Sequence, residues 1–235
     1  MNKVDKEFNP SIFHIGYLIR RNLLKNLLKN KDLIHGKVMD LGCGSKPYKS
    51  LFNFDEYIGV DIDNNPGHSH VNEDIEVYYN GKDLPFDDDS FDTIFCSEVF
   101  EHVFELEYLL EEIHRVLKPG GNILFTCPFT FPEHEQPNDY ARYTSFALKY
   151  LLNKKGFSDV NVSKSGTMIE TIGQMRILYF HHAIMPYFNK IPIVRQVLRK
   201  SVNFFINGTS TILSYILPNS EVLYLSNIVM AKKSE

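Results

Sequence analysis

The chain has 235 residues, of which 43% are hydrophobic and 23% are charged, and this is the composition of an ordinary globular protein with a buried core. The formal net charge is −4 and neither end carries a run of like charges, so we expect no nucleic-acid partner. The apolar stretches are interrupted before the roughly 20 residues that a membrane span requires. No signal peptide is recognisable, and the three cysteines lack CxxC spacing, which predicts a cytoplasmic protein with reduced thiols and no structural metal.

Residues 1–35 predict an amphipathic helical segment. Ser11 suits the N-cap position, and apolar residues recur at roughly helical spacing from Ile12 to Leu28, with basic residues between them. We expect this basic face to contact solvent, with a membrane surface as the alternative.

A regular alternation of strands and helices begins at residue 36. A helical pattern starts near Glu98 and closes with a Pro-Gly-Gly break. This alternation predicts an α/β fold with a doubly wound, mostly parallel sheet covered on both faces, and ligands of such folds bind at the carboxyl ends of the strands. The strand patterns of this region are residues 37–42, 57–63, 91–97 and 121–128.

The C-terminal part of the chain predicts one further helix and two strands. The helix begins at Thr144 or Ser145 and ends at Gly156. A strand follows and completes a core of residues 36–166, to which residues 222–235 add the final strand. The intervening residues 167–221 are too many for a simple connection, so we expect a helical insertion there.

The glycine turn at Gly42 and Gly44 follows an apolar strand, and a glycine turn lets backbone approach a ligand closely. A dinucleotide site would favour another glycine at position 47, which here is Pro47. This argues for a ligand without a pyrophosphate. Asp61, at the end of the second strand, is placed to accept hydrogen bonds from both hydroxyls of a ribose, or else simply initiates a turn.

Five motifs, in this order and spacing, resemble those of the class I S-adenosylmethionine-dependent methyltransferases, in particular the small-molecule subgroup with the LPF, SFD, EHV and LKPGG series. The resemblance covers about residues 35–165. It implies a seven-stranded Rossmann-like sheet and S-adenosylmethionine as cofactor, and in-line methyl transfer from this cofactor is expected to require no metal. The motifs are residues 38–44, 59–62, 83–92, 97–103 and 117–121.

The resemblance also implies roles for single residues. The backbone at Gly42 and Gly44 would lie against the methionine part of the cofactor, with Asp40 supporting the loop. Asp61, followed by Ile62, would hold the ribose. The other implied positions are Asn80, Asp83 and Leu84 at the adenine, and Ser97 and Glu98 near the sulfonium and the substrate.

Two residues depart from the family pattern. Lys46 replaces a frequent third glycine, and Asn80 replaces the usual acid; both are expected to weaken or reshape cofactor binding. His102, which many relatives share, is expected to lie near the substrate, or else to cap or pack a helix.

The stretch 132–145 concentrates groups that can form hydrogen bonds or titrate at a position that should rim the site, and it resembles a segment seen in a subset of these methyltransferases. We expect His134 to act as a general base, with Asp139 or Arg142 orienting it or the substrate. Tyr140 and Tyr143 are expected to contact the substrate. The alternative is a network that fastens the loop, in which Arg142 pairs with Asp139.

The insertion at 167–221 is rich in large apolar residues and carries five basic against two acidic residues. We expect it to be a lid over the substrate site. A surface that receives an amphiphilic substrate or an anionic membrane is the alternative, and a dimer surface would have the same composition.

Together these features predict methyl transfer to a hydroxyl or amine of a small or medium-sized acceptor, with a preference for a sugar, a glycan precursor or a lipid-linked intermediate. A nicotinamide-dependent oxidoreductase and a non-catalytic cofactor-binding scaffold are the alternatives.

Overall fold

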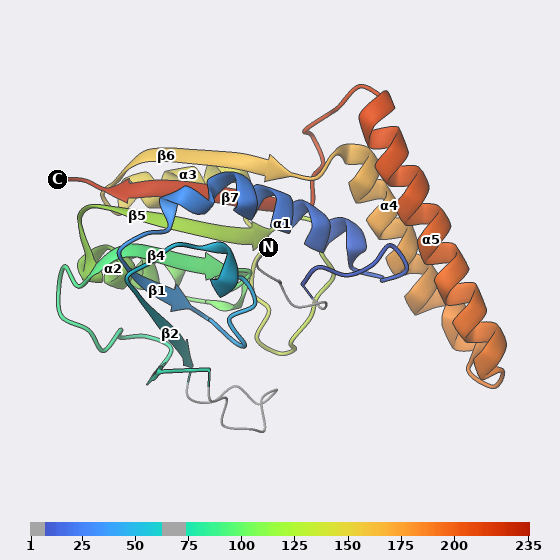
Figure 1. Ribbon diagram of the computed structural model, residues 1–235, viewed down its shortest axis with the longest axis horizontal. Coiled ribbons are helices and arrows are strands. Elements are labelled where there is room, and N and C mark those ends of the chain that lie inside the picture. The colour runs from blue at the N-terminus through green and yellow to red at the C-terminus, as the bar shows by residue number, and fades with distance from the viewer. Residues whose placement is uncertain (1–7, 63–73) are drawn as a thin grey trace. The chain divides into compact units, whose positions relative to one another are not determined.

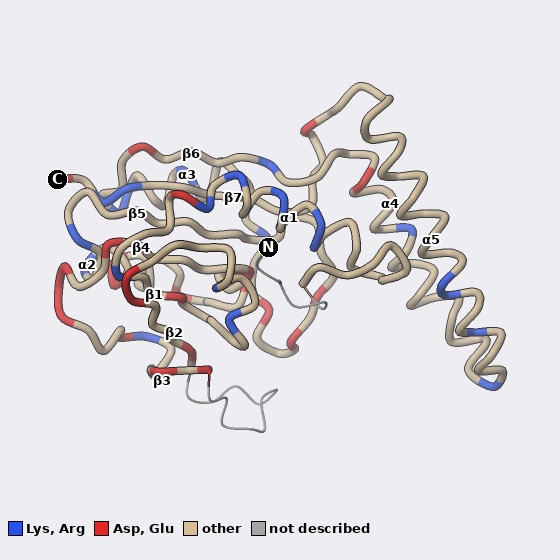
Figure 2. The backbone as a smooth tube through the Cα atoms, viewed as in Figure 1, with Lys and Arg blue, Asp and Glu red and all other residues tan. Residues whose placement is uncertain are grey.

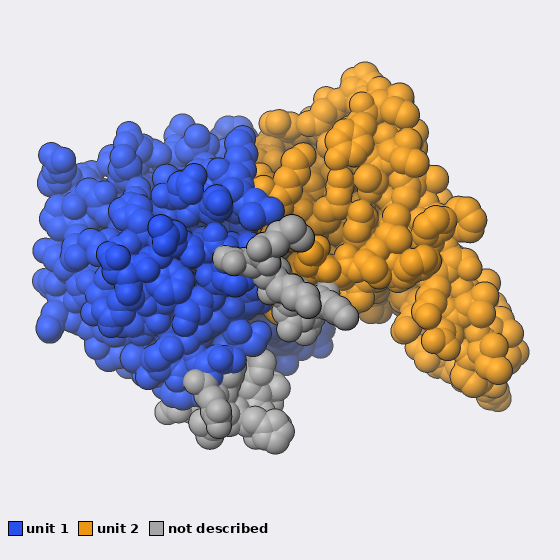
Figure 3. All heavy atoms as spheres, in the orientation of Figure 1, with its two compact units in different colours: residues 1–4, 27–163, 227–235 blue, residues 5–26, 164–226 orange. Residues whose placement is uncertain are grey.

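The computed structural model describes residues 8–62 and 74–235 (Figure 1). The chain divides into two compact units (Figure 3). The first contains the sheet and comprises described parts of residues 27–163 together with 227–235, and the second comprises described parts of residues 5–26 together with 164–226. The insertion and residues 8–26 of the expected N-terminal segment therefore belong to one unit, whereas residues 27–35 belong to the unit with the sheet.

The first unit contains a seven-stranded sheet with the order β3-β2-β1-β4-β5-β7-β6. β1 pairs in parallel with β2 and with β4, and the pairs β2–β3 and β4–β5 are parallel as well. This confirms the predicted doubly wound α/β sheet. The strands are β1 Lys37–Leu41, β2 Glu56–Ile62, β3 Val77–Tyr79, β4 Phe91–Ser97, β5 Leu117–Pro128, β6 Phe157–Ser165 and β7 Ser226–Lys233.

The apolar pattern of each strand in the sequence reflects how deeply that strand is buried in the sheet. β1 and β4 lie in the middle of the sheet and are almost continuously buried, which is why they read as unbroken apolar runs. β3 has three residues and was not recognised, because so short a strand shows no periodicity. The predicted strand 57–63 ends at Ile62, and residue 63 lies outside the described residues. All three cysteines are free and buried, as expected.

The helix predicted after β4 is shorter than expected. A 3-10 turn, η3, covers Phe100–His102, and the helix α2 runs over Leu106–Val116 with five apolar residues buried on one face. The Pro-Gly-Gly segment lies inside β5 instead of closing the helix, since β5 begins at Leu117. A register shift against β4 accommodates it.

The helix α3, Ser145–Lys154, begins as predicted, because the Thr144 side chain accepts a hydrogen bond from Ala147 N at 3.2 Å. The helix α1, Tyr17–Asn30, begins later than predicted, and residues 11–16 form turns. Carbonyls of this segment accept hydrogen bonds from Asn203 and Asn207, so Ser11 caps no helix.

The second unit contains the helix α4, Met168–Tyr179, and the long helix α5, Pro192–Ile216, joined by short irregular turns. Thr167 and Glu170 form a reciprocal capping box at the start of α4. Asn203, Asn207 and Ser210 are buried on α5, whereas most of its large apolar side chains are exposed. Basic residues mark the first half of α5 (Figure 2). Within the described residues, none of the helices is long and apolar enough to cross a bilayer.

Candidate active site

A cavity of about 850 Å³ opens in the first unit, bounded by residues at the carboxyl ends of β1, β2 and β4. This is where ligands bind in folds with a parallel sheet, and the volume is that of a small-molecule site. Seven of the residues predicted from the sequence line it: Gly42, Gly44, Asp61, Ile62, Glu98, His102 and Tyr140.

The glycine turn forms one wall of the cavity. Gly42 and Gly44 have φ angles of +68° and +49°, in the left-handed region that favours glycine. A Cβ atom added at Gly42 would collide with Val99, whereas one added at Gly44 would meet nothing within 4 Å. Gly44 therefore leaves open space above the loop, as a close approach of a ligand to the backbone requires.

Asp61 fixes this turn from the neighbouring strand. Its carboxylate accepts hydrogen bonds from Gly44 N at 3.0 Å and from Ile62 N at 2.8 Å. Both predicted roles, holding a ligand and fastening a turn, are thus compatible with its position on the cavity wall.

Glu98 follows β4 directly and has a φ angle of +56°, an uncommon conformation for a residue with a side chain. Its amide donates to Thr126 O at 3.0 Å, and this contact holds Glu98 against β5 at the cavity. Ser97 lies within hydrogen-bond distance of Thr126 Oγ1, at 3.0 Å, and is absent from the cavity lining.

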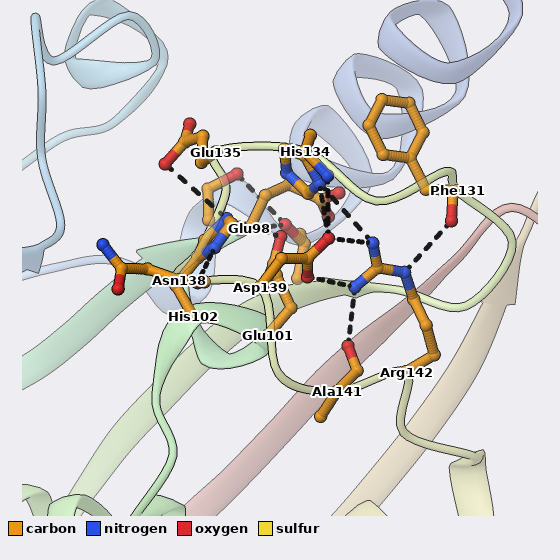
Figure 4. Close-up of polar contacts among 12 residues, drawn as sticks. Glu98, Glu101, His102, Phe131, His134, Glu135, Asn138, Asp139, Ala141 and Arg142 are labelled. Atoms are coloured by element: carbon orange, nitrogen blue, oxygen red, sulfur yellow. Dashed lines mark hydrogen bonds and ion pairs between the residues drawn. The ribbon is translucent and has the colours of Figure 1, made fainter. Parts of the chain in front are cut away.

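The loop after β5 is fastened by a bidentate ion pair (Figure 4). Arg142 Nη1 and Nη2 donate to the two carboxylate oxygens of Asp139, both at 2.6 Å, and these bonds hold the pKa of Asp139 far below its usual value. Arg142 also donates to the carbonyls of Phe131 and Pro132. Arg142 thus acts on the loop itself, as the alternative interpretation of the sequence predicted.

His134 is oriented by the same carboxylate. Its backbone N donates to Asp139 Oδ2 at 2.9 Å, and its Nδ1 lies 3.2 Å from that oxygen. Burial, together with the neighbouring His102, holds the pKa of His134 below its usual value. With Nδ1 facing an acceptor, the neutral ring carries its hydrogen there and leaves the Nε2 lone pair for other chemistry.

His102 and His134 lie together although they come from different segments, with ring centroids 4.7 Å apart. His102 Nδ1 lies 2.7 Å from Asn138 O, and its Nε2 lies 3.7 Å from Glu101 Oε1 and 3.8 Å from Glu135 Oε2. Glu101 is fully buried, and burial raises its pKa well above the usual value.

Residues 39–125 match the protein family described as a methyltransferase domain. This match identifies the segment as a methyltransferase domain. The family resemblance predicted from the motifs is thereby confirmed.

Two curated relatives illustrate the extent of the likeness. A phosphoethanolamine N-methyltransferase of Caenorhabditis elegans is 31% identical over 100 residues, which are 41% of this chain and 22% of that protein. A demethylmenaquinone methyltransferase of Staphylococcus haemolyticus is 28% identical over 160 residues, which are 63% of this chain and 65% of that protein. The chain thus spans less than two thirds of the length of these relatives.

Solved structures share the fold. A SAM-dependent methyltransferase of Archaeoglobus fulgidus gives a TM-score of 0.54 at 21% identity and covers 97% of both chains. A phosphoethanolamine N-methyltransferase of Haemonchus contortus, in complex with phosphomonomethylethanolamine and S-adenosylhomocysteine, gives 0.54 at 18% identity and covers 98% of this chain and 58% of that one.

Asp40, which the resemblance assigned to the support of the glycine turn, is absent from the cavity lining. It is buried in β1 and accepts a hydrogen bond from the Tyr57 hydroxyl at 2.7 Å. Desolvation raises its pKa to about 7, although the bond from Tyr57 and the charge of Lys46 act against the rise.

Lys46, the departure from the family's third glycine, is buried and forms an ion pair with Glu76. Glu76 also accepts a hydrogen bond from Gly59 N. Partial burial acts to raise the pKa of Glu76, but the bonds from Lys46 and Gly59 hold it below the usual value. Sequence reasoning missed Glu76; the signal was a lysine at a position beside the sheet, which requires a counter-charge.

The structure places the predicted adenine residues away from the cavity lining. Asn80 Oδ1 accepts hydrogen bonds from Lys82 N at 2.8 Å and Asp83 N at 2.7 Å, so this amide closes a turn. Asp83 is exposed and accepts from the Tyr108 hydroxyl at 2.6 Å, and Leu84 belongs to the core. The cavity is lined at this end by residues that were not predicted: Tyr79, Gly81, Lys82 and Tyr108.

Of the residues in the loop after β5, some line the cavity and others do not. Tyr140 lines the cavity, as do the unpredicted Glu135 and Asn138, whereas His134, Asp139 and Arg142 are absent from the lining. Tyr143 packs against the core, and its carbonyl accepts from Asn227 Nδ2 at 2.9 Å. The spacing of the loop motif gave no means of separating residues that face the cavity from those that fasten the loop.

Proposed function

We propose that this chain transfers a methyl group from S-adenosylmethionine to a hydroxyl or amine of a small or medium-sized acceptor. The observation that carries the proposal is that one cavity of about 850 Å³ has Gly42, Gly44 and Asp61 on its lining together with Glu98, His102 and Tyr140. The first three residues suit the amino-acid and ribose parts of the cofactor. The others supply polar and aromatic groups for an acceptor.

The reaction needs alignment and the loss of one proton. The acceptor's lone pair forms a bond to the methyl carbon as the carbon–sulfur bond breaks, and the pair of that bond stays on sulfur, which becomes a neutral thioether. The enzyme's part is to hold donor and acceptor in line and to exclude water. We assign removal of the acceptor's proton to the site of His102 and His134, whose rings are held by Asn138 O and Asp139.

The acceptor class is part of the proposal. Relatives are named for phosphoethanolamine, demethylmenaquinone and glycine, sarcosine or dimethylglycine, and one is named for tRNA. The net charge of −4 disfavours a nucleic acid. Exposed apolar side chains on α5, next to Arg195 and Arg199, favour an amphiphilic acceptor such as a lipid-linked sugar.

Methyl transfer from labelled S-adenosylmethionine into an extract of the source cells tests the proposal. The extract is incubated with and without purified protein and then separated into organic, aqueous and macromolecular fractions. We expect protein-dependent label in the organic fraction. Label in the aqueous fraction would redirect the search to a soluble sugar or metabolite, and label in the macromolecular fraction, or none, would contradict the proposal.

A further inference from the structure

Three side chains beside the cavity form a cluster that methyl transfer does not by itself require. Glu101 and His102 come from η3, and His134 comes from the loop that follows β5, as Figure 4 shows. Each offers one oxygen or nitrogen atom, and these three atoms lie within 4.8 Å of one another. Ligand atoms about 2.0 to 2.2 Å from one tetrahedrally coordinated ion are about 3.3 Å apart, so small side-chain rotations would bring all three to a shared ion.

Glu101 is the first sign of a missing ligand. Its exposed fraction is 0%, and neither carboxylate oxygen has a hydrogen-bond partner among the residues that the structure describes. A buried carboxylate without a partner is costly. The nearest basic atom that forms an ion-pair contact with it is His102 Nε2, at 3.7 Å, which is too long for a hydrogen bond. The missing partner is therefore a group that fits between the carboxylate and the imidazole.

The two histidines show an arrangement that is typical of metal ligands. His102 Nδ1 faces the backbone carbonyl of Asn138, and His134 Nδ1 faces the carboxylate of Asp139. Metal-binding histidines almost always donate one ring N–H to such an acceptor, which fixes the tautomer and leaves the other nitrogen for the metal. Arg142 donates two hydrogen bonds to Asp139, so the carboxylate that orients His134 is itself held in place.

We propose that Glu101, His102 and His134 bind one divalent transition-metal ion, with Zn²⁺ as the first candidate. Two imidazoles and one carboxylate are a donor set of catalytic metal sites that keep an open coordination position. Sequence reasoning missed this site, because cysteine spacing bears only on a structural metal and because Glu101 and His134 are far apart in the chain.

The role of the ion, though not its binding, rests on the proposed function. His102 and Glu135 line the cavity, so an open coordination position there would accept the acceptor's hydroxyl. The ion would lower the pKa of that hydroxyl, whose proton would pass to the exposed carboxylate of Glu135. The acceptor oxygen would then form the new bond to the methyl carbon, and sulfur would keep the electron pair of the broken bond. His134 acts in this case as a ligand instead of a general base.

Metal titration of the purified full chain tests the proposal. The protein is stripped with a chelator, dialysed and titrated with Zn²⁺ by calorimetry, and Co²⁺ is used as a second probe because its visible absorption reports nitrogen and oxygen coordination. We expect one ion per chain. Glu101→Gln and His134→Ala should each weaken binding by more than about 100-fold, because loss of outer support alone costs about 10 to 100-fold.

Asp139→Asn tests the loss of outer support alone, because it removes a group that orients His134 and no ligand. It should weaken Zn²⁺ binding by about 10 to 100-fold. His182→Ala is the matched control, because it removes an exposed imidazole of the second unit and should leave the affinity unchanged. Binding of S-adenosylhomocysteine, measured on every variant, shows that the fold and the cofactor site persist.

The outcomes are separable. Wild-type protein that binds S-adenosylhomocysteine but no metal, or whose metal binding survives Glu101→Gln and His134→Ala, would overturn the metal site and leave the proposed function standing. Metal binding lost in His182→Ala would also overturn it by placing the ion elsewhere. A protein that binds Zn²⁺ through these residues but no S-adenosylhomocysteine would support the site and contradict the proposed function.

Discussion

At the scale of single residues, the two aspartates near the glycine turn, Asp40 and Asp61, lie in different environments. Asp40 is buried under the turn, with its pKa raised to about 7, chiefly by desolvation. In the unfolded chain the same group has a pKa near 3.8, so the folded state holds this proton at pH values where the unfolded state has released it. The contribution to stability is therefore fully present below pH 3.8 and is lost as the pH rises towards 7.

Replacing Asp40 by asparagine should remove this dependence while keeping an oxygen for the Tyr57 hydroxyl. We expect the free energy of unfolding of Asp40→Asn, relative to wild type, to increase by an amount on the order of 4 kcal/mol as the pH rises from about 4 to above 7. Urea unfolding over this pH range measures the difference. Asp55→Asn, at an exposed position, is the control, and a difference that stays flat with pH would contradict the assignment.

Asp61 is the residue on which cofactor affinity should depend most. It lines the cavity and already accepts two backbone hydrogen bonds. We expect Asp61→Ala to weaken S-adenosylhomocysteine binding at least tenfold, about 1.4 kcal/mol, because charge-assisted hydrogen bonds to the ribose are lost. Calorimetry measures the affinity.

A conservative variant separates the two roles of Asp61. Asp61→Asn retains an amide oxygen for Gly44 N and should lose less affinity than Asp61→Ala. Asp55→Ala should lose none, since Asp55 is absent from the cavity lining. Equal affinities in wild type and Asp61→Ala would remove Asp61 from the binding site.

At the scale of elements, the turn between β1 and the loop at Lys46 contains two glycines with different functions. Both have positive φ angles, so alanine at either position costs about 1 to 2 kcal/mol in backbone strain. Only Gly42 also has a side chain, that of Val99, in the way of a Cβ atom.

We therefore expect Gly42→Ala to destabilise the fold by more than Gly44→Ala, measured by thermal unfolding without ligand. Gly44→Ala should instead act mainly on cofactor affinity, because its Cβ atom would enter the open space at the cavity. If Gly44→Ala bound S-adenosylhomocysteine as tightly as wild type, the cofactor would not lie against this loop.

At the scale of the whole molecule, residues from the two ends of the sequence complete one compact unit. Asn207 Nδ2 donates to Ile12 O at 2.7 Å and His14 O at 3.0 Å, and Asn203 Nδ2 donates to Phe13 O at 2.9 Å. Both asparagines are buried on α5, so their side chains depend on these bonds for satisfaction, and the bonds hold the segment that precedes α1.

Asn207→Ala should destabilise this segment by about 1 to 3 kcal/mol, because it removes two part-buried hydrogen bonds, each worth about 0.5 to 1.5 kcal/mol. Amide hydrogen exchange should rise at residues 11–16 and stay unchanged in the strands of the first unit. Thr209→Ala, at an exposed position of the same helix, is the control. Faster exchange throughout the sheet would show that the two units do not open independently.

The sequence alone determined the domain that carries the cofactor site. Buried strands read as apolar runs, and glycine and acidic residues mark their carboxyl ends, so local pattern was sufficient for the sheet, for the turn at Gly42 and Gly44 and for the position of Asp61. These features depend on neighbours within a few residues. The family resemblance added the seven-stranded topology.

The tertiary structure decided how distant residues combine. It pairs Lys46 with Glu76, brings Glu101 and His102 to His134, and ties residues 12–14 to α5. It also turns Leu84 into the core and assigns Arg142 to the loop. No local pattern specifies such pairings, because the free energy of a buried charge or amide depends on partners that only the packed chain brings within hydrogen-bond distance.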